Sequence, residues 1–441
     1  KQSGSTLTLG GSGTAVTLAC GATQTGFGRT GTVDWVTTIQ TSSPFTAESG
    51  KGYFINTTSG AITMNLPSSP SAGDIVSFKD YARTFSSNNL TVGRGGSNMD
   101  GIAEDSLFST KGLTGTLIYM DATKGWSLIN DDATVGLGAQ YIVASGGTET
   151  TSGDFKIHTF TGPGTFTVSA VGNSSGSSAV DYMVVAGGAA GAGKNDGGGV
   201  GGGGAGGIRI GTVCQPSPIS PAPLVAPGHT VSAQGYSIVV GGGGPSNICT
   251  PNGTAGASGS ISSFSSFTSA GGGGGNDAAN NGAAGGSGGG AGEATGTKGA
   301  GNTPPVSPPQ GNPGGDGNSP SVGGGGGGFT AAGESSTPSN TSPTGNGGDG
   351  INAGPIFGTA NGSPAGNFGG GGGASTGQPA TGPFVGGSGG GGQGNSHDQA
   401  STSGVANTGG GGGAHGSTGA PQGGTNGGGS GIVIIRYKFQ N

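Results

Sequence analysis

Charged residues are scarce in this chain of 441 residues, at 8% of the total. Lys and Arg number 14 against 20 Asp and Glu, which gives a net charge of -6, and the basic residues are scattered. Binding to nucleic acid or to an anionic membrane surface needs a basic patch, so we expect neither partner. The carboxylates are too sparse to indicate a general acid/base pair. We therefore predict no enzymatic activity and no cofactor.

Long apolar runs are lacking, and cysteines are few. No segment approaches the roughly 20 apolar residues that a transmembrane helix needs, so membrane insertion is not expected. The three cysteines match no zinc-binding spacing. Cys214 and Cys249 flank a proline-rich excursion, where a disulfide between them and two free thiols are both open alternatives. Cys20 lies in an alternating strand pattern, where a cysteine packs as a small apolar residue.

Glycine, by contrast, supplies 113 residues and recurs in long runs. Runs of five or six glycines occupy residues 271–275, 323–328, 369–373 and 409–413, with shorter runs between them. Spaced runs of this kind indicate a repeat architecture. Because glycine loses more backbone entropy on folding than any other residue, ordering them requires a packing in which the missing side chain is an advantage. Polyproline II geometry, with three residues per turn and no internal hydrogen bonds, predicts a bundle of polyglycine II helices without α-helix.

The rest of the chain predicts an all-β fold. Short stretches of β-branched and aromatic residues, separated by Gly, Pro, Asn and Asp, are typical of sandwiches and barrels. The predicted parts are an N-terminal β hairpin connector (1–33), a β-sandwich-like domain (34–131), a linker (132–147), a β-rich base with the proline-rich excursion (148–240), the polyglycine II bundle (241–431) and a closing strand (432–441).

The β-rich base carries more specific expectations. Residues 154–171 predict a hairpin around a Gly-Pro-Gly turn. The apolar segments 182–185, 236–240 and 432–437 need burial on both faces, and we expect them to share one sheet. Glycine arms would project from this sheet to a far end that carries the loops. His158 lies in an alternating strand and is expected to be structural.

One segment resembles a phosphate-binding P-loop, the sequence GAAGAGKN at residues 188–195. Asn195 replaces the Ser or Thr that would hold magnesium. The glycines that follow cannot form the helix on which a phosphate site depends. A nucleotide site is therefore not predicted. No metal site is predicted either, because no Cys, Asp or Glu cluster accompanies the four histidines at ligand spacing.

The segments between the glycine runs mix proline, Ser, Thr and Asn with an occasional aromatic residue. Proline lowers the entropy lost on binding, aromatic side chains beside small polar groups form contact surfaces, and several loops are longer than turn closure requires. Solvated turns are the alternative for any single loop. The candidate contact residues are Pro304, Pro305, Phe329, Ile356, Phe357, Gln378, Phe384, His397 and Asp398.

Several motifs resemble those of a known family. YFINTTSGAITMNLPSSPSAGDIVSFKDYA, followed by NNLTVGRGGSNMDG and LIYMDATKGW, resembles a repeated β-domain of bacteriophage tail fibres, especially those of marine phages. KIHTFTGPGTFTV, DYMVVAGG and GIVIIRY resemble the glycine-rich module that ends many such fibres. The resemblance covers most of the chain.

This resemblance implies a non-enzymatic, homotrimeric fibre subunit of the virion, joined to other tail proteins on its N-terminal side and placed outside the host cell at its surface. In related phage adhesins, packed polyglycine helices carry loops that bind the host. The resemblance thus implies that the loops here contact a bacterial surface glycan or an outer-membrane protein.

Two other functions are weighed against host attachment. A structural surface appendage or matrix protein would use the same architecture without a specific receptor. An ice-binding protein would need short uniform turns and a regular array of threonines, and the long heterogeneous loops argue against it.

Overall fold

The computed structural model describes residues 33–129, 140–173, 176–195, 197–213, 219, 224–277, 280–293, 296–317, 322–337, 344–377, 384–396, 400–416 and 426–440. The chain divides into two compact units, Lys1–Gly138 and Ala139–Asn441. The described part is nearly all β, with one four-residue helix and no closed barrel. The all-β prediction is confirmed. The hairpin predicted at the N-terminus lies outside the described residues.

The first unit consists of two sheets between which the chain alternates. One sheet has the order β1-β3-β5-β8-β9 and the other β2-β4-β6-β7. The first six strands pair in parallel within each sheet, so the chain coils, and β7, β8 and β9 close the coil with antiparallel pairs. The strands are β1 (Asp34–Gln40), β2 (Phe45–Thr46), β3 (Lys51–Ile55), β4 (Ile62–Asn65), β5 (Ile75–Asp80), β6 (Leu90–Gly93), β7 (Ser106–Phe108), β8 (Thr114–Tyr119) and β9 (Trp126–Leu128).

Alternation within these strands builds the core of the first unit. In β4, Ile62 and Met64 are buried while Thr63 and Asn65 are only partly covered, as the two-residue period of a strand requires. The buried side chains of both sheets, including Phe78 and Trp126, form one cluster. Two facing sheets agree with the predicted sandwich-like domain, whereas its parallel coiling is not evident from the sequence.

The second unit contains a two-layer sandwich. Its five-stranded sheet has the order β10-β13-β18-β19-β20, and its seven-stranded sheet has the order β11-β12-β23-β14-β15-β16, with β17 paired to β14. These strands are β10 (Val143–Ser145), β11 (Thr148–Ser152), β12 (Phe155–Phe160), β13 (Gly164–Ala170), β14 (Ala179–Val185), β15 (Ile208–Thr212), β16 (Val225–Pro227), β17 (His229–Thr230), β18 (Gly235–Val239), β19 (Ser262–Phe264), β20 (Phe267–Ser269) and β23 (Ile432–Lys438).

Two expectations for this sandwich are wrong. β14 and β23 pair as predicted, but β18 lies in the other sheet, because only one of its faces is buried while Ser237 and Val239 are exposed. β12 and β13 form no hairpin, since each pairs with strands of a different sheet. The chain crosses between the layers there, and Phe160 and Phe166 both point into the shared core.

A second buried cluster covers the other face of the seven-stranded sheet. It joins Met183 and Ile434 of that sheet to Phe329 and Phe368. The covering segment includes β21 (Ile351–Asn352), α1 (Gly354–Phe357) and β22 (Asn367–Phe368). The helix α1 contradicts the expectation that the glycine-rich region contains none. It has a proline in its first turn, which is where proline is tolerated in a helix.

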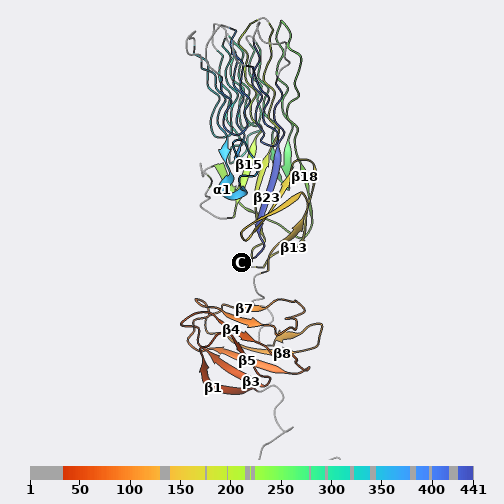
Figure 1. Cartoon of the computed structure of the whole chain (residues 1–441), viewed down its shortest axis with the longest axis vertical. Helices are drawn as coiled ribbons and strands as arrows, with labels where there is room; N and C mark the ends of the chain where they lie inside the picture. The colour runs from red at the N-terminus through yellow and green to blue at the C-terminus, as the bar shows by residue number, and fades with distance from the viewer. Residues whose placement is uncertain are drawn as a thin grey trace, which may run out of the picture. The chain divides into compact units, whose positions relative to one another are not determined.

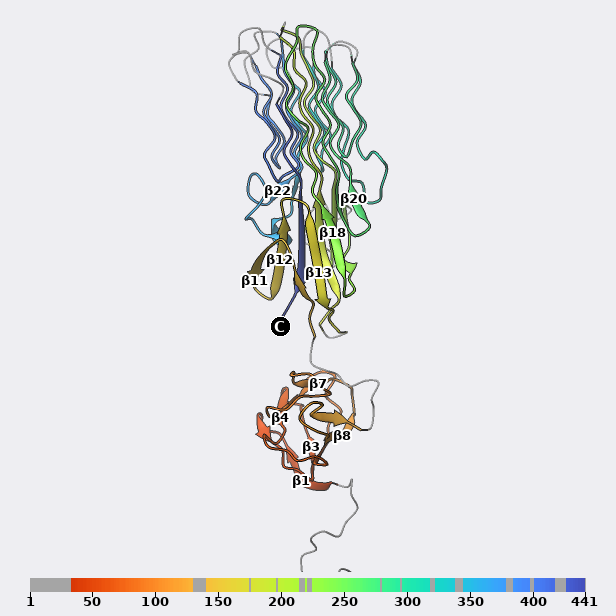
Figure 2. The same ribbon diagram turned by 90° about the vertical axis from the view of Figure 1, so that its right-hand side faces the viewer.

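Glycine-rich arms continue from the strands and run side by side (Figure 1), as the perpendicular view confirms (Figure 2). We call the end where the arms meet β14, β15, β18 and β23 the sheet end, and the opposite end the distal end. The arms begin at residue 186, directly after β14, and therefore earlier than the predicted start at 241. None of the described residues of the long glycine runs forms a strand.

Hydrogen bonds between arms repeat every third residue. Gly201, Gly204 and Gly207 donate to the arm at 270–276, Gly202 and Ala205 donate to the arm at 322–328, and Gly203 and Gly206 donate to the arm at 409–412. One arm therefore bonds to three neighbours in turn. A period of three residues is that of the polyproline II helix, so the bonding fits the predicted packing, while the polyglycine II conformation itself stays a prediction.

The close approach of the arms accounts for the glycines. A Cβ atom on Gly203 would lie 2.3 Å from the carbonyl oxygen of Ala189, and one on Gly371 would lie 2.1 Å from that of Gly326. No real Cβ contact is that short. The arms thus exclude side chains at these glycine positions, and the side chains buried between arms are mostly small ones such as Ala189 and Ala205.

Candidate functional site

The distal end of the bundle is the candidate contact surface, and one turn there, residues 245–254, is described in full. The turn connects the arm after β18 to the arm before β19. It lies beside the end of the first arm, because the Thr254 N–H donates to the Gly193 carbonyl at 2.7 Å and the Asn195 N–H donates to the Thr250 carbonyl at 3.2 Å.

Side-chain hydrogen bonds fix the shape of this distal turn. The Thr254 hydroxyl donates to the Ile248 carbonyl at 3.0 Å, and the Thr250 hydroxyl donates to the Gly253 carbonyl at 2.8 Å. The Asn195 amide donates to the Cys249 carbonyl at 2.9 Å. A turn held in this way has already lost much of its conformational entropy, so less is lost when it binds a partner.

Ile248 projects from the distal turn with 84% of its surface exposed, more than any other large apolar side chain in the described ranges. Single exposed apolar residues are common on protein surfaces, so its position is what distinguishes it. It lies at the distal end, on a fixed backbone and next to exposed Thr250. An isolated aliphatic residue between Asn247 and Cys249 in a turn-forming sequence is the signal that sequence reasoning missed.

The structure places the predicted contact residues differently from the expectation. Pro304 and Pro305 are exposed, but they lie at the sheet end. The Gln310 side chain donates to the Pro304 carbonyl at 2.8 Å, and the Gln310 carbonyl accepts from the first residue of β15 at 2.9 Å. Loops occur at both ends of the bundle because successive arms run in opposite directions.

Four predicted contact residues are buried, so the prediction is wrong for them and they contribute to packing instead. Phe329, Ile356 and Phe357 cover the outer face of the seven-stranded sheet. Phe384 packs with Val322 and Ala374 between arms. Their positions in proline-rich and polar segments suggested exposure, but the apolar face of a sheet needs a cover and large aromatic side chains supply it. Gln378, His397 and Asp398 lie outside the described residues.

The disulfide alternative for Cys214 and Cys249 is wrong. Cys249 is a buried free thiol at the distal end. Cys214 is outside the described residues, but the preceding Val213 bonds to Asp181 at the start of β14. Fourteen residues of extended chain separate Asp181 from Asn195, whose side chain bonds Cys249. At about 3.1 Å per residue this is roughly 40 Å, far beyond the Cα separation of about 7 Å that a disulfide permits.

The P-loop-like segment is part of an arm. The backbone N–H groups from Gly188 to Gly193 donate to carbonyls of neighbouring arms, so they do not face a phosphate. At its end the Lys194 ammonium lies 3.3 Å from the Glu293 carboxylate. Glu293 also accepts from the Gly199 N–H at 3.1 Å, which ties two arms together near the distal end.

His158 is fully buried between the layers of the sandwich and is structural, as predicted. Nδ1 lies 2.7 Å from the Gly146 carbonyl and must carry the hydrogen, because a carbonyl only accepts. In the neutral ring Nε2 then accepts from the Tyr437 hydroxyl at 3.1 Å. Burial lowers the pKa of His158 from its usual 6.5, and burial also lowers the pKa of His229 and His415.

These pKa shifts predict an acid-sensitive second unit. Below the unfolded pKa of 6.5 the unfolded chain binds protons that the folded chain does not, so stability is complete above that pH and falls as the pH drops. We expect the thermal unfolding temperature of this unit to decrease between about pH 7 and pH 5. The variant His158→Phe, whose ring cannot be protonated, should show a weaker pH dependence; an unchanged dependence would contradict this assignment.

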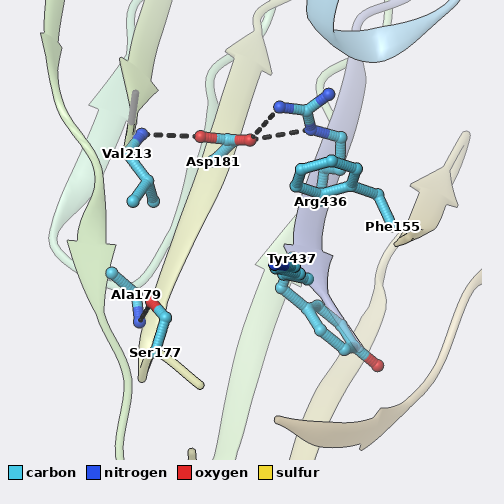
Figure 3. Close-up of a pocket in the computed structure, with 8 residues that line it drawn as sticks. Phe155, Ser177, Ala179, Asp181, Val213, Arg436 and Tyr437 are labelled. Atoms are coloured by element: carbon cyan, nitrogen blue, oxygen red, sulfur yellow. Dashed lines mark hydrogen bonds and ion pairs between the residues drawn. The ribbon is translucent and has the colours of Figure 1, made fainter. Parts of the chain in front are cut away.

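A pocket lies against β14 and β23 near Phe155 and Tyr437 (Figure 3). Two of its charged groups, Asp181 and Arg436, pair with each other. The Asp181 carboxylate accepts from the Arg436 guanidinium at 2.7 Å and from the Val213 N–H at 2.6 Å. The guanidinium lies 4.1 Å from the centre of the Phe155 ring and donates to the Ile356 carbonyl at 2.9 Å. The Asp181–Arg436 pair therefore attaches α1 to the sheet, and the guanidinium of Arg436 is occupied by contacts within the fold.

Metal sites and membrane-spanning helices were also sought among the described residues. No group of three or more His, Cys, Asp or Glu side chains is placed to hold a metal ion there. No helix in the same ranges is long and apolar enough to cross a membrane.

Comparison with known proteins agrees with the architecture of the second unit. The model of the glycine-rich domain family matches residues 159–438, which is more than half of the chain and includes both the sandwich and the arms. No curated protein matches the chain. The chain belongs to the glycine-rich domain family.

Proposed function

We propose that the chain is a subunit of a bacteriophage tail fibre and attaches the virion to its bacterial host. The distal end of the glycine bundle would contact a surface glycan or an outer-membrane protein. The proposal rests on the motifs that resemble tail-fibre domains and on the membership of residues 159–438 in the glycine-rich domain family.

The observation that carries the proposal is the closed interior of the arms. A Cβ atom on any of Gly202, Gly203 or Gly371 would lie within 2.3 Å of a neighbouring carbonyl oxygen. Larger residues are therefore excluded at these glycines, whereas loop ends tolerate changes that packed segments do not. A rigid scaffold with variable ends is suited to recognition of variable surfaces. An appendage without a receptor remains the alternative, and it would not require side chains held in fixed positions at one end.

Assembly and location complete the proposal. A homotrimer formed through the N-terminal half would bring several distal ends together, and simultaneous contacts would raise a weak affinity by avidity. Other tail proteins would join on the N-terminal side, and the site of action would be the outside of the host cell.

Ile248 provides a direct test of the distal contact. We expect phage carrying Ile248→Asp to adsorb to the host at least about tenfold more slowly, because loss of a central interfacial anchor costs about 2 kcal/mol or more. Ile261→Asp is the matched control, since Ile261 is also exposed, at 53%, but precedes β19 at the sheet end. Both variants should assemble normally.

The outcomes separate the candidate functions. Slower adsorption with Ile248→Asp alone supports distal recognition. Equal slowing by both variants would place the contact elsewhere on the chain. Normal adsorption of both, with intact virions, would contradict the contact role of Ile248 and favour the structural appendage.

A further inference from the structure

The outer arms of the bundle carry side chains where the inner arms carry glycine. These outer arms are residues 280–285, 296–300, 313–317, 332–337, 344–349 and 384–388. Exposed positions on them include Asn281, Lys298, Ser335, Asn346 and Asp349. An arm on the outside of a lattice has backbone N–H groups that point away from every neighbouring arm, so an edge of this kind resembles the open edge of a β-sheet.

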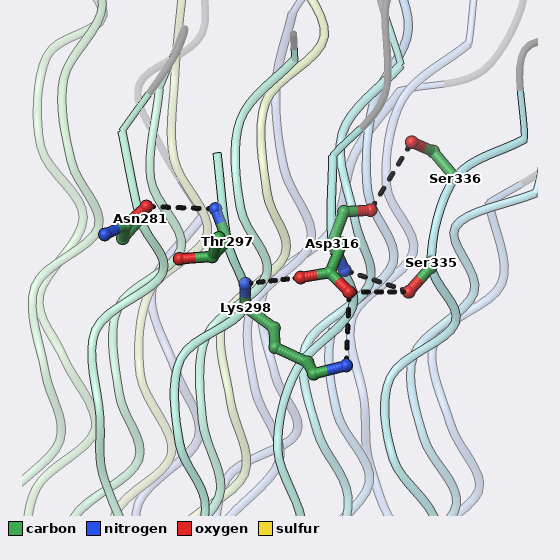
Figure 4. Close-up of polar contacts among 6 residues, drawn as sticks. All are labelled: Asn281, Thr297, Lys298, Asp316, Ser335 and Ser336. Carbon is green, nitrogen blue, oxygen red and sulfur yellow. Dashed lines mark hydrogen bonds and ion pairs between the residues drawn. The ribbon is translucent and has the colours of Figure 1, made fainter. Parts of the chain in front are cut away.

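Side chains from adjacent outer arms accept hydrogen bonds from these outward N–H groups. Figure 4 shows the row that crosses neighbouring arms. The Thr297 N–H donates to Asn281 Oδ1 at 2.9 Å, and the Lys298 N–H donates to Asp316 Oδ1 at 2.9 Å. The Asp316 N–H in turn donates to the Ser335 hydroxyl at 3.0 Å.

The same arrangement continues beyond this row. The Asn346 N–H donates to Glu334 Oε2 at 3.2 Å, and the Val385 N–H donates to Asn346 Oδ1 at 2.9 Å. The Ser388 N–H donates to Asp349 Oδ1 at 2.9 Å. Each acceptor is a side chain of the arm next to the donor, so each is positioned to cap an N–H group that no further arm reaches.

We propose that this capped face is closed to a second copy of the chain, and that the capping side chains prevent arms of one copy from adding to the bundle of another. The bonding pattern of the arms is self-complementary, since every third residue bonds to the same neighbour. An outer arm without caps would therefore present backbone N–H donors with the same three-residue spacing as the carbonyl acceptors of another outer arm. Packing at that spacing excludes side chains at many positions, because a Cβ added at glycines such as Gly203 or Gly371 meets a neighbouring carbonyl at about 2 Å.

Removal of the caps tests the proposal. The variant Asn281→Gly, Asp316→Gly, Asn346→Gly, Asp349→Gly removes four of the six capping side chains and two negative charges. The control Asp316→Asn, Asp349→Asn removes the same two charges and keeps the capping oxygens. Sedimentation velocity of the intact protein over a range of concentrations should show larger, concentration-dependent species for the glycine variant only. The control should sediment as the unsubstituted chain does.

Two results would overturn the proposal. One is a glycine variant that retains its circular dichroism and sediments like the unsubstituted chain. The other is equal association of the control, which would assign the effect to charge. If the fourfold variant fails to fold, the pair Asn346→Gly, Asp349→Gly opens a single arm and is measured in the same way. A folded pair without association also overturns the proposal.

Discussion

The substitution Gly371→Val is expected to destabilise the second unit by about 3 kcal/mol or more. A Cβ atom at this position would lie 2.1 Å from the Gly326 carbonyl oxygen and 2.8 Å from that of Gly327. Overpacking of this kind costs about 1–3 kcal/mol. The Gly371 N–H also donates to Gly348 and its carbonyl accepts from Gly387, and each lost hydrogen bond adds about 1 kcal/mol.

Gly242→Val is the matched control for this prediction. Gly242 is part of a glycine run in another arm, but a Cβ atom there would meet nothing within 4 Å. Its substitution should change stability by less than about 0.5 kcal/mol. Ser375 is not a suitable control, because it is fully buried and its hydroxyl accepts from the Val200 N–H at 3.1 Å.

Calorimetry measures the unfolding temperature of the second unit in this experiment, and tryptophan fluorescence identifies the unfolding of the first unit. Both tryptophans, Trp35 and Trp126, belong to the first unit. Their fluorescence should therefore follow a transition that neither substitution changes. If Gly371→Val and Gly242→Val unfold at the same temperature, the arms do not pack as closely as the structure shows.

The β elements and the close packing of the glycine runs are predictable from local sequence. Alternation in Ile62–Asn65 and the apolar run in Ile432–Lys438 are enough to identify two strands, because each pattern reflects the faces that a strand buries. The choice of pairing partner for a strand depends less on local sequence. β18 joins the second sheet and β12 and β13 separate into different layers, since the choice depends on how whole sheets face one another.

The contact residues are harder to predict, for two physical reasons. The sequence of a loop does not reveal whether its arm ends at the sheets or at the distal end, and Pro304 lies at the sheets. Aromatic residues in polar loops also resemble exposed anchors, whereas Phe329 and Phe357 bury an apolar sheet face that the arms leave uncovered. Ile248 is neither a proline nor an aromatic residue, and its place at the distal end follows only from the path of the chain.

The substitution Asp181→Ala is expected to destabilise the second unit by about 3–5 kcal/mol, because it leaves a buried charge unpaired. The side chains of Asp181 and Arg436 are only 4% and 14% exposed, and their closest atoms lie 2.7 Å apart. The change also removes the acceptor of the Val213 N–H. Chemical unfolding followed by tyrosine ellipticity measures the effect, while the tryptophan fluorescence of the first unit should stay unchanged.

The double variant Asp181→Leu, Arg436→Met distinguishes pairing from packing. Replacing both members of a buried ion pair by apolar residues is often neutral, so this variant should recover much of the stability that Asp181→Ala loses. Recovery should remain incomplete, because the Ile356 carbonyl of α1 loses its donor and Phe155 loses the guanidinium beside its ring. A double variant no more stable than Asp181→Ala would contradict the unpaired charge as the cause. The attachment of α1 to the sheet would then depend on contacts of Arg436 other than its pairing with Asp181.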